Sequence, residues 1–562
     1  MRIHRLGTAS VALLAAAALA ACSPSVPATV VTGTRVVMGW TGELTSLNAL
    51  ADPTPGNLEV AAATRDGFGE RVDGEFVADE SFGTVSIVGD DPFVVRYDLA
   101  EPSWSDGTPV DAADLLLGWA WAAGLLADAD GAVSAGDQTV AEVDEFARSI
   151  EVVFGRPTSA WQTAVTAQVP AHVVGGLAFG IEDPMEAKQA VIRAIQERDA
   201  ARLAAIAEAW NDGFAVDEGS DIAGELLLAS GPYRVDGVSW TAEGQSVRLI
   251  PNEQYRGAAT AQIAAVDLVP AGEDPLSSLG DGLDIVRVTP TAENFAVVHR
   301  LERRDTVVET TDDGTVWSVL LRSEGVFAGH AARSAFLRTV PVNDMIDRGA
   351  GPWASAYTKT TSMVSAPGSS AYDIVVEDSG FTAALGTAPE DAEAEREVAG
   401  VGSGTPVCVL YDRDSPFASG AFAALRDVAA EAGWEVADCG SDDFDGAVGQ
   451  DQWDAVITAV PVPSTPAQLA AQWGSDGEAS LVAQTDTDRD ALIAELAQTT
   501  DVYTARELYA QIEATIVRAA VARPLAMDPV VTLVAPDVDG VVVRGGATAP
   551  LTAGIAQWTA VP

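Results

Sequence analysis

Position 22 carries the first side chain in this sequence whose surroundings indicate a specific chemistry, a cysteine thiol. It follows Leu19-Ala20-Ala21, and before these lie two arginines and an apolar run at 11–20 that is too short to span a bilayer. A basic start, a short apolar middle and small residues before a cysteine are typical of a bacterial lipoprotein signal, whose cleavage leaves the thiol to be acylated. We therefore predict a signal peptide at 1–21, lipidation of Cys22 and a tether at 22–34.

Two or three acyl chains form a stable membrane anchor. The sequence therefore predicts a mature protein held by lipid on the extracytoplasmic face of the cell membrane. The alternative is an ordinary cleaved signal followed by a chance cysteine. After the signal, no stretch of the 562 residues is long and apolar enough to cross a bilayer.

The other two cysteines, Cys408 and Cys439, can form a disulfide in an oxidising compartment. Strand-like runs at 405–412 and 434–438 flank a helical pattern at 421–432. Such a β-α-β unit has parallel strands that can lie side by side, which would bring the two thiols within bonding distance. Two buried free thiols are the alternative.

Charge excludes some partners. The chain has 82 acidic and 32 basic residues and a formal net charge of −50. So acidic a protein does not hold nucleic acid or an anionic lipid surface by charge. Abundant Ala, Gly, Val and Asp with only two lysines, Lys188 and Lys359, indicates GC-rich coding and an actinobacterial source.

Patterns for catalysis and for metal binding are missing. The histidines after the signal, His172, His299 and His330, show no ligand-like spacing, so we predict neither a metal nor another cofactor. No Gly-x-Ser-x-Gly, His-Glu-x-x-His or Ser-x-x-Lys pattern stands in a suitable context. We predict a protein that is not an enzyme, with an anchored hydrolase as the remote alternative.

Apolar periodicity and turn residues divide the rest of the chain into strands and helices in mixed order. Asp183 followed by Pro184 is a strong helix start, because the aspartate caps the first turn and proline fits there. The same criteria give strands at 35–40, 85–88, 93–99 and 149–154, helices that begin at 111 and 183 (with a break at 198–199), a helix at 503–520, and strands within 524–543. This mixture predicts an α/β or α+β protein with more than one lobe.

Seven short patterns follow one another along almost the whole mature chain. They are Gly42-Glu43-Leu44-Thr45-Ser46-Leu47-Asn48-Ala49; Trp104-Ser105-Asp106-Gly107-Thr108-Pro109-Val110 with Ala113-Asp114; Val169-Pro170-Ala171-His172-Val173; Ser230-Gly231-Pro232-Tyr233 with Asn252-Glu253-Gln254-Tyr255-Arg256-Gly257; Leu283-Asp284-Ile285-Val286; Ala332-Arg333-Ser334-Ala335-Phe336; and Ala505-Arg506 with Pro524-Leu525. Any one of them is weak evidence. In this order they resemble family 5 of the extracellular solute-binding proteins, the oligopeptide- and dipeptide-binding lipoproteins of ABC importers.

The resemblance implies a two-lobed, periplasmic-binding-protein-like fold of the large, three-subdomain type, with a hinge between the lobes. The first lobe would comprise 35–289 plus 525–562, including a subdomain at roughly 52–165, and the second lobe 290–524. The implied function is to capture oligopeptides between the lobes and to deliver them, as a monomer, to the permease subunits of an ABC importer. A non-peptide solute and a sensor or scaffold role are the alternatives.

The residue that usually holds a peptide's amino group in this family is absent. Relatives carry an aspartate soon after a strand that corresponds to 453–457, and here Thr458-Ala459-Val460-Pro461-Val462-Pro463-Ser464 follows instead. A buried ammonium group without a partner is costly, so another carboxylate would have to replace the aspartate. Glu43, with its neighbour Leu44, is the substitute that the resemblance suggests, and a solvated loop acid is the equal alternative.

Four further residues are candidates for the ligand site. Arg322 stands where relatives have an asparagine and can pair bidentately with a ligand carboxylate, although a partner among the many acids of this chain is slightly favoured. Trp40, Trp317 and Trp353 are candidate apolar walls, and each is more typical of core packing.

Overall fold

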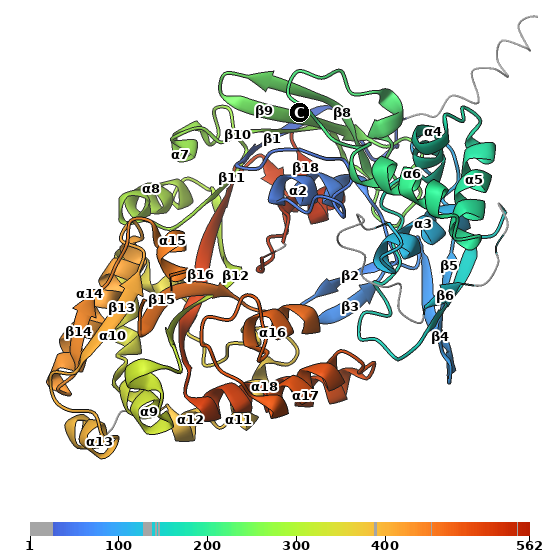
Figure 1. The fold of residues 1–562 in the computed structure, drawn as a ribbon. Coiled ribbons are helices and arrows are strands. Elements are labelled where there is room, and N and C mark those ends of the chain that lie inside the picture. Colours follow the sequence, from blue (N-terminus) through green and yellow to red (C-terminus); the bar gives the residue numbers. More distant parts are fainter. Residues whose placement is uncertain are drawn as a thin grey trace, which may run out of the picture.

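The structure is a computed structural model that describes residues 26–126, 138–140, 143, 146–386, 391–450, 452–547 and 549–562. The predicted signal peptide, Cys22 and the start of the predicted tether lie outside these ranges. Figure 1 shows two masses, one mostly blue and green and the other mostly yellow and orange. We call the first lobe I and the second lobe II.

One large mixed sheet runs through both lobes. Over the described residues it has ten strands. Their spatial order is β14 (Glu435–Asp438), β13 (Pro406–Tyr411), β15 (Ala455–Pro461), β12 (Val307–Leu321), β16 (Ala522–Val534), β11 (Ile285–Val288), β1 (Val31–Trp40), β10 (Ile263–Pro270), β9 (Gly244–Pro251) and β8 (Tyr233–Thr241). The sheet contains both parallel and antiparallel pairs, which confirms the predicted mixed α/β class.

Lobe I adds a second sheet, a small hairpin and several helices. The sheet has the order β4 (Gly83–Asp90), β5 (Phe93–Leu99), β7 (Ser149–Phe154) and β6 (Thr139–Val140), and the hairpin consists of β2 (Gly69–Val72) and β3 (Glu75–Ala78). The helices are α2 (Pro55–Thr64), α3 (Ala112–Ala122), α4 (Ala171–Phe179), α5 (Pro184–Gln196) and α6 (Ala200–Asn211), with η2 (Gly224–Leu227), and the C-terminal η5 (Leu551–Gln557), β17 (Val538–Asp539) and β18 (Thr559–Ala560) return to this lobe.

Lobe II is mostly helical around its half of the large sheet. Its elements are α8 (Ala292–Glu302), η3 (Gly325–Phe327), α9 (His330–Thr339), α10 (Val342–Ala350), η4 (Gly351–Ala356), α11 (Tyr372–Asp378), α12 (Phe381–Ala384), α13 (Ala392–Val398), α14 (Pro416–Glu431), α15 (Phe444–Val448), α16 (Pro466–Trp473), α17 (Thr487–Leu496) and α18 (Val502–Ala519). The short helix α7 (Pro275–Ser278) precedes the first crossing between the lobes, and its Leu276 packs in the lobe II core.

The chain passes between the lobes at β11 and at the end of β16. Ile285 belongs to the apolar core of lobe I, whereas the next residue, Val286, belongs to a core of lobe II. Near the other crossing, Leu533 packs in lobe II and Val534 in lobe I. Adjacent strand residues point to opposite faces, so each crossing strand contributes to both cores. The boundaries at 289 and 524 stay a prediction, and these two positions are the structural markers nearest to them.

Helix starts follow the predicted capping residues. The Asp183 side chain accepts a hydrogen bond from the N–H of Glu186 at the start of α5, and Asp199 caps α6 after the predicted break. Asp111 and Asp114 form a capping box at the start of α3. The single buried lysine, Lys188, reaches these acids from α5, so the cap also joins two helices.

The first strand is longer than predicted. β1 begins at Val31, inside the segment predicted as tether, because Val31 pairs with Ile263 of β10 and its N–H donates to the Gln262 carbonyl at 2.9 Å. Backbone pairing thus extends the ordered chain into residues whose composition suggested a linker. The tether predicted at 22–34 therefore overlaps strand β1 at 31–34.

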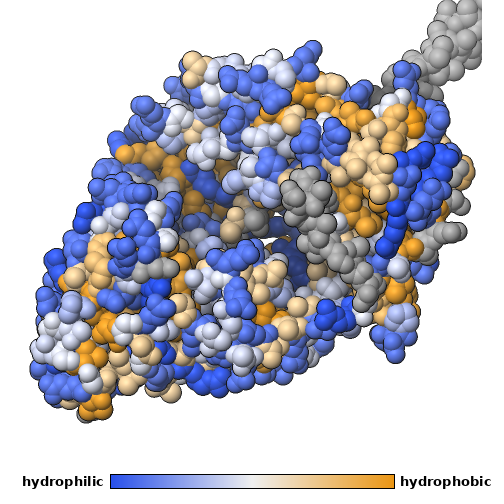
Figure 2. All heavy atoms as spheres, in the orientation of Figure 1, coloured by the Kyte–Doolittle hydropathy of each residue, from blue (hydrophilic) through white to orange (hydrophobic). Residues whose placement is uncertain are grey.

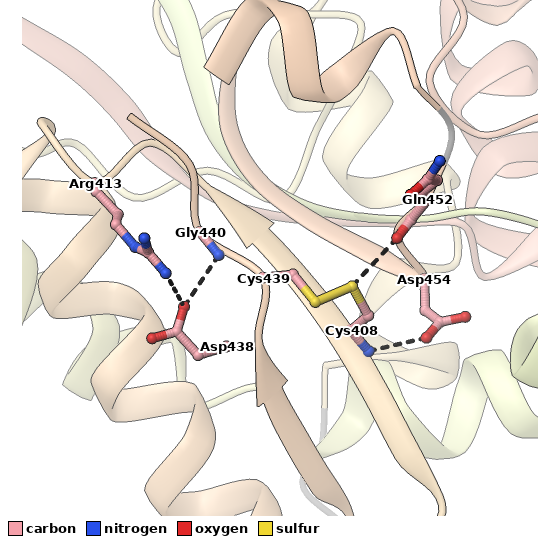
Figure 3. The surroundings of a disulfide bond; sticks show 7 residues. All are labelled: Cys408, Arg413, Asp438, Cys439, Gly440, Gln452 and Asp454. Atoms are coloured by element: carbon pink, nitrogen blue, oxygen red, sulfur yellow. Dashed lines mark hydrogen bonds and ion pairs between the residues drawn. A yellow bond between two sulfur atoms is a disulfide. The ribbon is translucent and has the colours of Figure 1, made fainter. Parts of the chain in front are cut away.

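The predicted β-α-β unit is present, and its strands are adjacent. β13 and β14 pair in parallel on either side of α14 in the chain. Cys408 and Cys439 form a disulfide with a Cα–Cα distance of 5.5 Å (Figure 3). The N–H of Cys408 donates to the Asp454 carboxylate at 2.9 Å, which ties the bridged strand to the start of β15.

Candidate functional site

A large cleft lies between the two lobes. Its volume is about 1610 Å³, and both lobes and the C-terminal segment line it. Figure 2 shows this face of the molecule hollowed at its centre. The lining segments are 65–81, 159–163 and 255–259 in lobe I, 364–371, 461–468 and 499–509 in lobe II, and 544–556 near the C-terminus, each of them in part.

The lobe I wall is built around the β2–β3 hairpin. Asp73 and Gly74 form its two-residue turn, and both have positive φ, 51° and 85°. An Asp-Gly pair suits such a turn because aspartate tolerates and glycine favours this backbone region. The hairpin places Glu70, Arg71 and Val77 along the cleft.

Beside the hairpin, the carboxylates of Asp66 and Asp79 and the phenol of Tyr255 lie at the cleft. Burial, together with the charge of Asp79, raises the pKa of Asp66 to about 7. The hydroxyl of Tyr255 and the N–H of Gly67 hydrogen-bond to Asp66 and partly oppose this rise in pKa. Asp66 thus lies in an environment that disfavours its negative charge unless a cation arrives.

The lobe II wall is held by a buried acid. The Glu513 carboxylate accepts hydrogen bonds from the hydroxyl of Ser362 at 2.8 Å and from the N–H groups of Met363 at 2.9 Å and Val364 at 3.1 Å. Burial raises the pKa of Glu513 to about 7. This acid fixes the start of the 364–371 segment, which lines the cleft.

A backbone hydrogen bond joins the lobes at one end of the cleft. The N–H of Ser159 in lobe I donates to the Ala497 carbonyl in lobe II at 2.9 Å. The structure therefore shows the two lobes in direct contact beside the cleft.

The residues predicted to bind a ligand are not gathered in this cleft. Trp40 and Glu43 line a separate pocket of about 460 Å³ together with Trp240 and Gln245. Leu44 is buried beneath that pocket, where its backbone bonds to the Gln245 side chain. These three residues are near one another.

The other three predicted site residues lie in lobe II, away from the smaller pocket. Trp317 is buried, and its ring is 4.4 Å from that of Phe417. The Trp353 indole donates to the Thr291 carbonyl at 2.8 Å. Arg322 pairs with Glu324 at 3.1 Å and lies over the Trp453 ring. None of the six is among the residues that line the large cleft, and their ligand role stays a prediction.

Sequence reasoning did not identify the hairpin, Asp66 or Asp79 as cleft residues, and it used Tyr255 only as part of a family pattern. A signal for the hairpin was present, because Asp73-Gly74 is a typical two-residue turn. For Asp66 and Asp79 no local signal distinguishes them from the many other acids. Only the fold brings Tyr255 to them.

Neither metal sites nor membrane spans are found in the described ranges. No group of three or more His, Cys, Asp or Glu side chains there could hold a metal ion. Among the helices of the same ranges, none combines the length and apolar character needed to cross a membrane.

Comparison with known proteins gives distant relatives in sequence. No protein-family model matches the chain. It is 28% identical to an uncharacterized lipoprotein of Mycobacterium leprae over 355 residues, which are 60% of this chain and 58% of that protein. It is 27% identical to an uncharacterized lipoprotein of Mycobacterium tuberculosis over 452 residues, 77% of this chain and 74% of that protein. The chain thus spans less than two thirds of the first of these relatives.

Solved structures match over nearly the whole chain. The periplasmic EDTA-binding protein EppA matches with a TM-score of 0.75 and 16% identity, covering 96% of this chain and 100% of that one. The substrate-binding protein CtaP of an ABC transporter from Listeria monocytogenes gives a TM-score of 0.69 and 15% identity over 94% and 100% of the two chains. The chain has the fold of the two-lobed solute-binding proteins.

A third solute-binding structure, the oligopeptide-binding protein AppA from Bacillus subtilis in complex with a nonapeptide, matches with a TM-score of 0.60 and 12% identity over 94% and 99% of the two chains. The solute-binding-protein fold is the one implied by the seven sequence patterns. The predicted resemblance to family 5 is therefore confirmed at the level of the fold. The matched structures are those of binding proteins, which agrees with the prediction of a non-enzyme.

Proposed function

We propose that this protein is a lipid-anchored extracellular solute-binding protein that captures oligopeptides in the cleft between its lobes and delivers them to the permease of an ABC importer. The observation that carries this proposal is the cleft itself. Its volume of about 1610 Å³ exceeds the roughly 300–1,000 Å³ of pockets for drug-sized molecules. An extended, multi-residue solute is the ligand class that such a space suits.

The lining chemistry supports a peptide. Apolar residues of the segments 461–466 and 364–371 line the cleft, and so do charged side chains of the hairpin. The 461–464 stretch belongs to the segment in which relatives carry the amine-binding aspartate, and here it lines the cleft without an acid. A peptide amino group would then need a carboxylate from another wall.

Asp66 is the carboxylate that we assign to this role, in place of Glu43. It lines the cleft, whereas Glu43 lines the smaller pocket. A bound ammonium would stabilise the ionised form of Asp66, and Asp79 would add a second negative charge beside it. Arg506 and Arg544 also line the cleft, where each is paired with an acid of the hairpin, Glu75 and Glu70 respectively.

A non-peptide solute is the second candidate. The missing aspartate favours it, and the neighbour EppA is an EDTA-binding protein with the same fold. Under this alternative the arginines and carboxylates of the cleft recognise a compact, charged molecule.

Import and sensing would use the same closed form, since a partner can recognise the ligand-induced state in either case.

Native mass spectrometry of the soluble protein that lacks residues 1–22 tests the proposal. The protein is measured folded and then denatured, and whatever co-purified is identified. A ladder of short peptides is the expected result and shows whether free amino ends are accepted. A single non-peptide mass would contradict the peptide assignment while leaving the binding function in place. A protein that emerges empty goes to a thermal-shift screen of defined peptides and small metabolites, in which no stabilisation by any peptide would overturn the proposal.

A further inference from the structure

The β2–β3 hairpin spans the space between the lobes while its base is fixed in lobe I. The N–H of Asp79 donates to the Phe68 carbonyl at 2.9 Å and closes the base of the hairpin. Phe68 packs edge-on against Phe82 at 5.1 Å, within the lobe I core. Beyond this base the two strands project between the lobes (Figure 1).

The hairpin has little packing of its own. No residue of β2 or β3 is buried, although Phe76 packs partly against the lobe I core. A lone two-stranded hairpin is only marginally stable in water. The position of its tip therefore depends on the contacts that it makes with its neighbours.

Those contacts reach lobe II, the C-terminal segment and Ser159 of lobe I, whose carbonyl accepts a hydrogen bond from Arg71 of β2 at 3.0 Å. Glu75 of β3 pairs with Arg506 of α18, with 2.5 Å between Oε1 and Nη2. At the turn, the Asp73 carbonyl accepts the N–H of Ser370 at 3.0 Å. On the other strand, Glu70 pairs with Arg544 at 2.7 Å.

Each of these contacts is polar and individually weak. The Glu75 side chain is 56% exposed and that of Arg506 20%, so water and salt compete with their pairing. An exposed ion pair of this kind shifts an equilibrium by about two- to fivefold. Regions with few buried apolar contacts and exposed hydrogen bonds are those that open locally at low cost.

We propose that the β2–β3 hairpin is a strap that detaches from lobe II to admit or release the solute, separately from the hinge between the lobes, and that the Glu75–Arg506 ion pair is its latch. This inference rests on the proposed function in one respect, because it takes the cleft as the site that binds the solute. Opening of the strap would uncover the cleft beside Asp66 without breaking the Ser159–Ala497 contact between the lobes.

Hydrogen exchange followed by mass spectrometry on the protein without solute tests this. The protein is unfolded in urea, freed of small molecules by dialysis and refolded. A peptide covering 366–371 reports the Ser370 amide, which docks on the strap, and a peptide covering 157–161 reports the Ser159 amide, which joins the lobes. In the Glu75→Gln variant we expect exchange in 366–371 to be about two- to fivefold faster, with 157–161 unchanged.

Asp427→Asn is the matched control, because it breaks an exposed ion pair with Arg348 at 2.6 Å in lobe II and changes the charge equally. It should leave both peptides unchanged. Raising NaCl from 0.05 to 0.5 M should speed exchange of 366–371 in the parent protein and have little further effect in Glu75→Gln.

Two results would contradict the proposal that the hairpin opens as a strap. If 366–371 and 157–161 accelerate together in Glu75→Gln, the ion pair belongs to the general closure of the lobes. If neither changes, the pair is not a latch. Since no solute is added, this outcome is independent of the mass spectrometry of the co-purified ligand, and either proposal can fail alone.

Discussion

The Glu513 carboxylate and the Ser362 hydroxyl lie 2.8 Å apart in the interior of lobe II, where both residues are almost completely buried. The same carboxylate oxygen accepts the N–H groups of Met363 and Val364. A single side chain of α18 thus satisfies three donors at the start of a cleft wall. Without it the Ser362 hydroxyl and the Met363 N–H would lose their acceptor in a buried place, whereas the Val364 N–H would keep the Ser362 oxygen at 3.2 Å.

Replacing Glu513 by leucine should lower the free energy of unfolding by about 3 kcal/mol, because the donors lose their acceptor and each unsatisfied group costs roughly 1–3 kcal/mol. Glu513→Gln keeps an acceptor oxygen and should cost about 1 kcal/mol. Urea unfolding measures both. Glu507→Gln, an exposed change on the same helix, serves as the control. Equal stability of Glu513→Leu and the parent would show that the wall is held in another way.

Lys188 offers a second test, since the chain has only one other lysine. Its Nζ lies 2.8 Å from Asp111 and 3.4 Å from Asp114, and all three side chains are buried. Lys188→Met should cost about 3–5 kcal/mol, because two carboxylates then stay buried without a cation. Lys359→Met is the control: Lys359 is exposed and bonds only to Asn343 at 2.6 Å among the described contacts, so its loss should cost less than about 1 kcal/mol. Similar unfolding midpoints for the two variants would contradict this.

Local chemistry made several elements predictable from the sequence. Strand β7 has the predicted bounds, Ser149–Phe154, and the break at 198–199 separates α5 from α6 as expected. Each of these depends on neighbours in the chain, such as the capping Asp199. The early start of β1 depends instead on pairing with β10, a strand far away in the sequence, and composition alone does not reveal such a partner.

The candidate site was less predictable because it is assembled from distant segments. Asp66 and Tyr255 meet only in the folded chain, and neither position differs locally from other acids and tyrosines. Glu43 was inferred by position in a family pattern, and the structure has it in another pocket. Patterns that carry turns and caps predict the fold, whereas the aspartate that holds a ligand's amino group in relatives is absent here and no local pattern marks a replacement.

The disulfide should contribute to stability as well as to the shape of lobe II. Cys408 and Cys439 are 31 residues apart, and closing a loop of that length stabilises the folded state by about 3–4 kcal/mol in the chain-entropy description. The Cys408→Ser, Cys439→Ser double variant should therefore unfold at lower urea, and a reducing agent should destabilise the parent but not the variant. Detection of two free thiols in the folded parent by alkylation and mass spectrometry would contradict the bond.

Stability should fall as pH rises from about 4 to about 7. Burial raises the pKa of Asp66 to about 7, of Glu513 to about 7 and of Asp528 to about 6, so the folded protein retains protons that the unfolded chain releases near pH 4. The three shifts together correspond to a loss of up to about 7 kcal/mol between pH 5 and pH 8. Urea unfolding across this range measures it, and Asp66→Asn should show a shallower decline. A stability that increases over the same range would mean that these carboxyls are ionised throughout.

A bound ammonium group should reverse this effect at Asp66. Because ionised Asp66 attracts a cation and neutral Asp66 does not, the affinity for a peptide with a free amino end should rise as pH increases from 6 to 7, below the pH of about 8 at which the peptide's own amino group loses its proton. The same peptide with an acetylated amino end should show no such rise.

Asp66→Asn should weaken binding of the free-amine form by about tenfold or more, since a paired buried charge loses its partner. Glu43→Gln, in the smaller pocket, is the matched control and should leave the affinity unchanged. Calorimetric titration measures the affinity of both variants. If Glu43→Gln loses binding and Asp66→Asn does not, the residue that holds the amino group is Glu43, as the sequence pattern suggested.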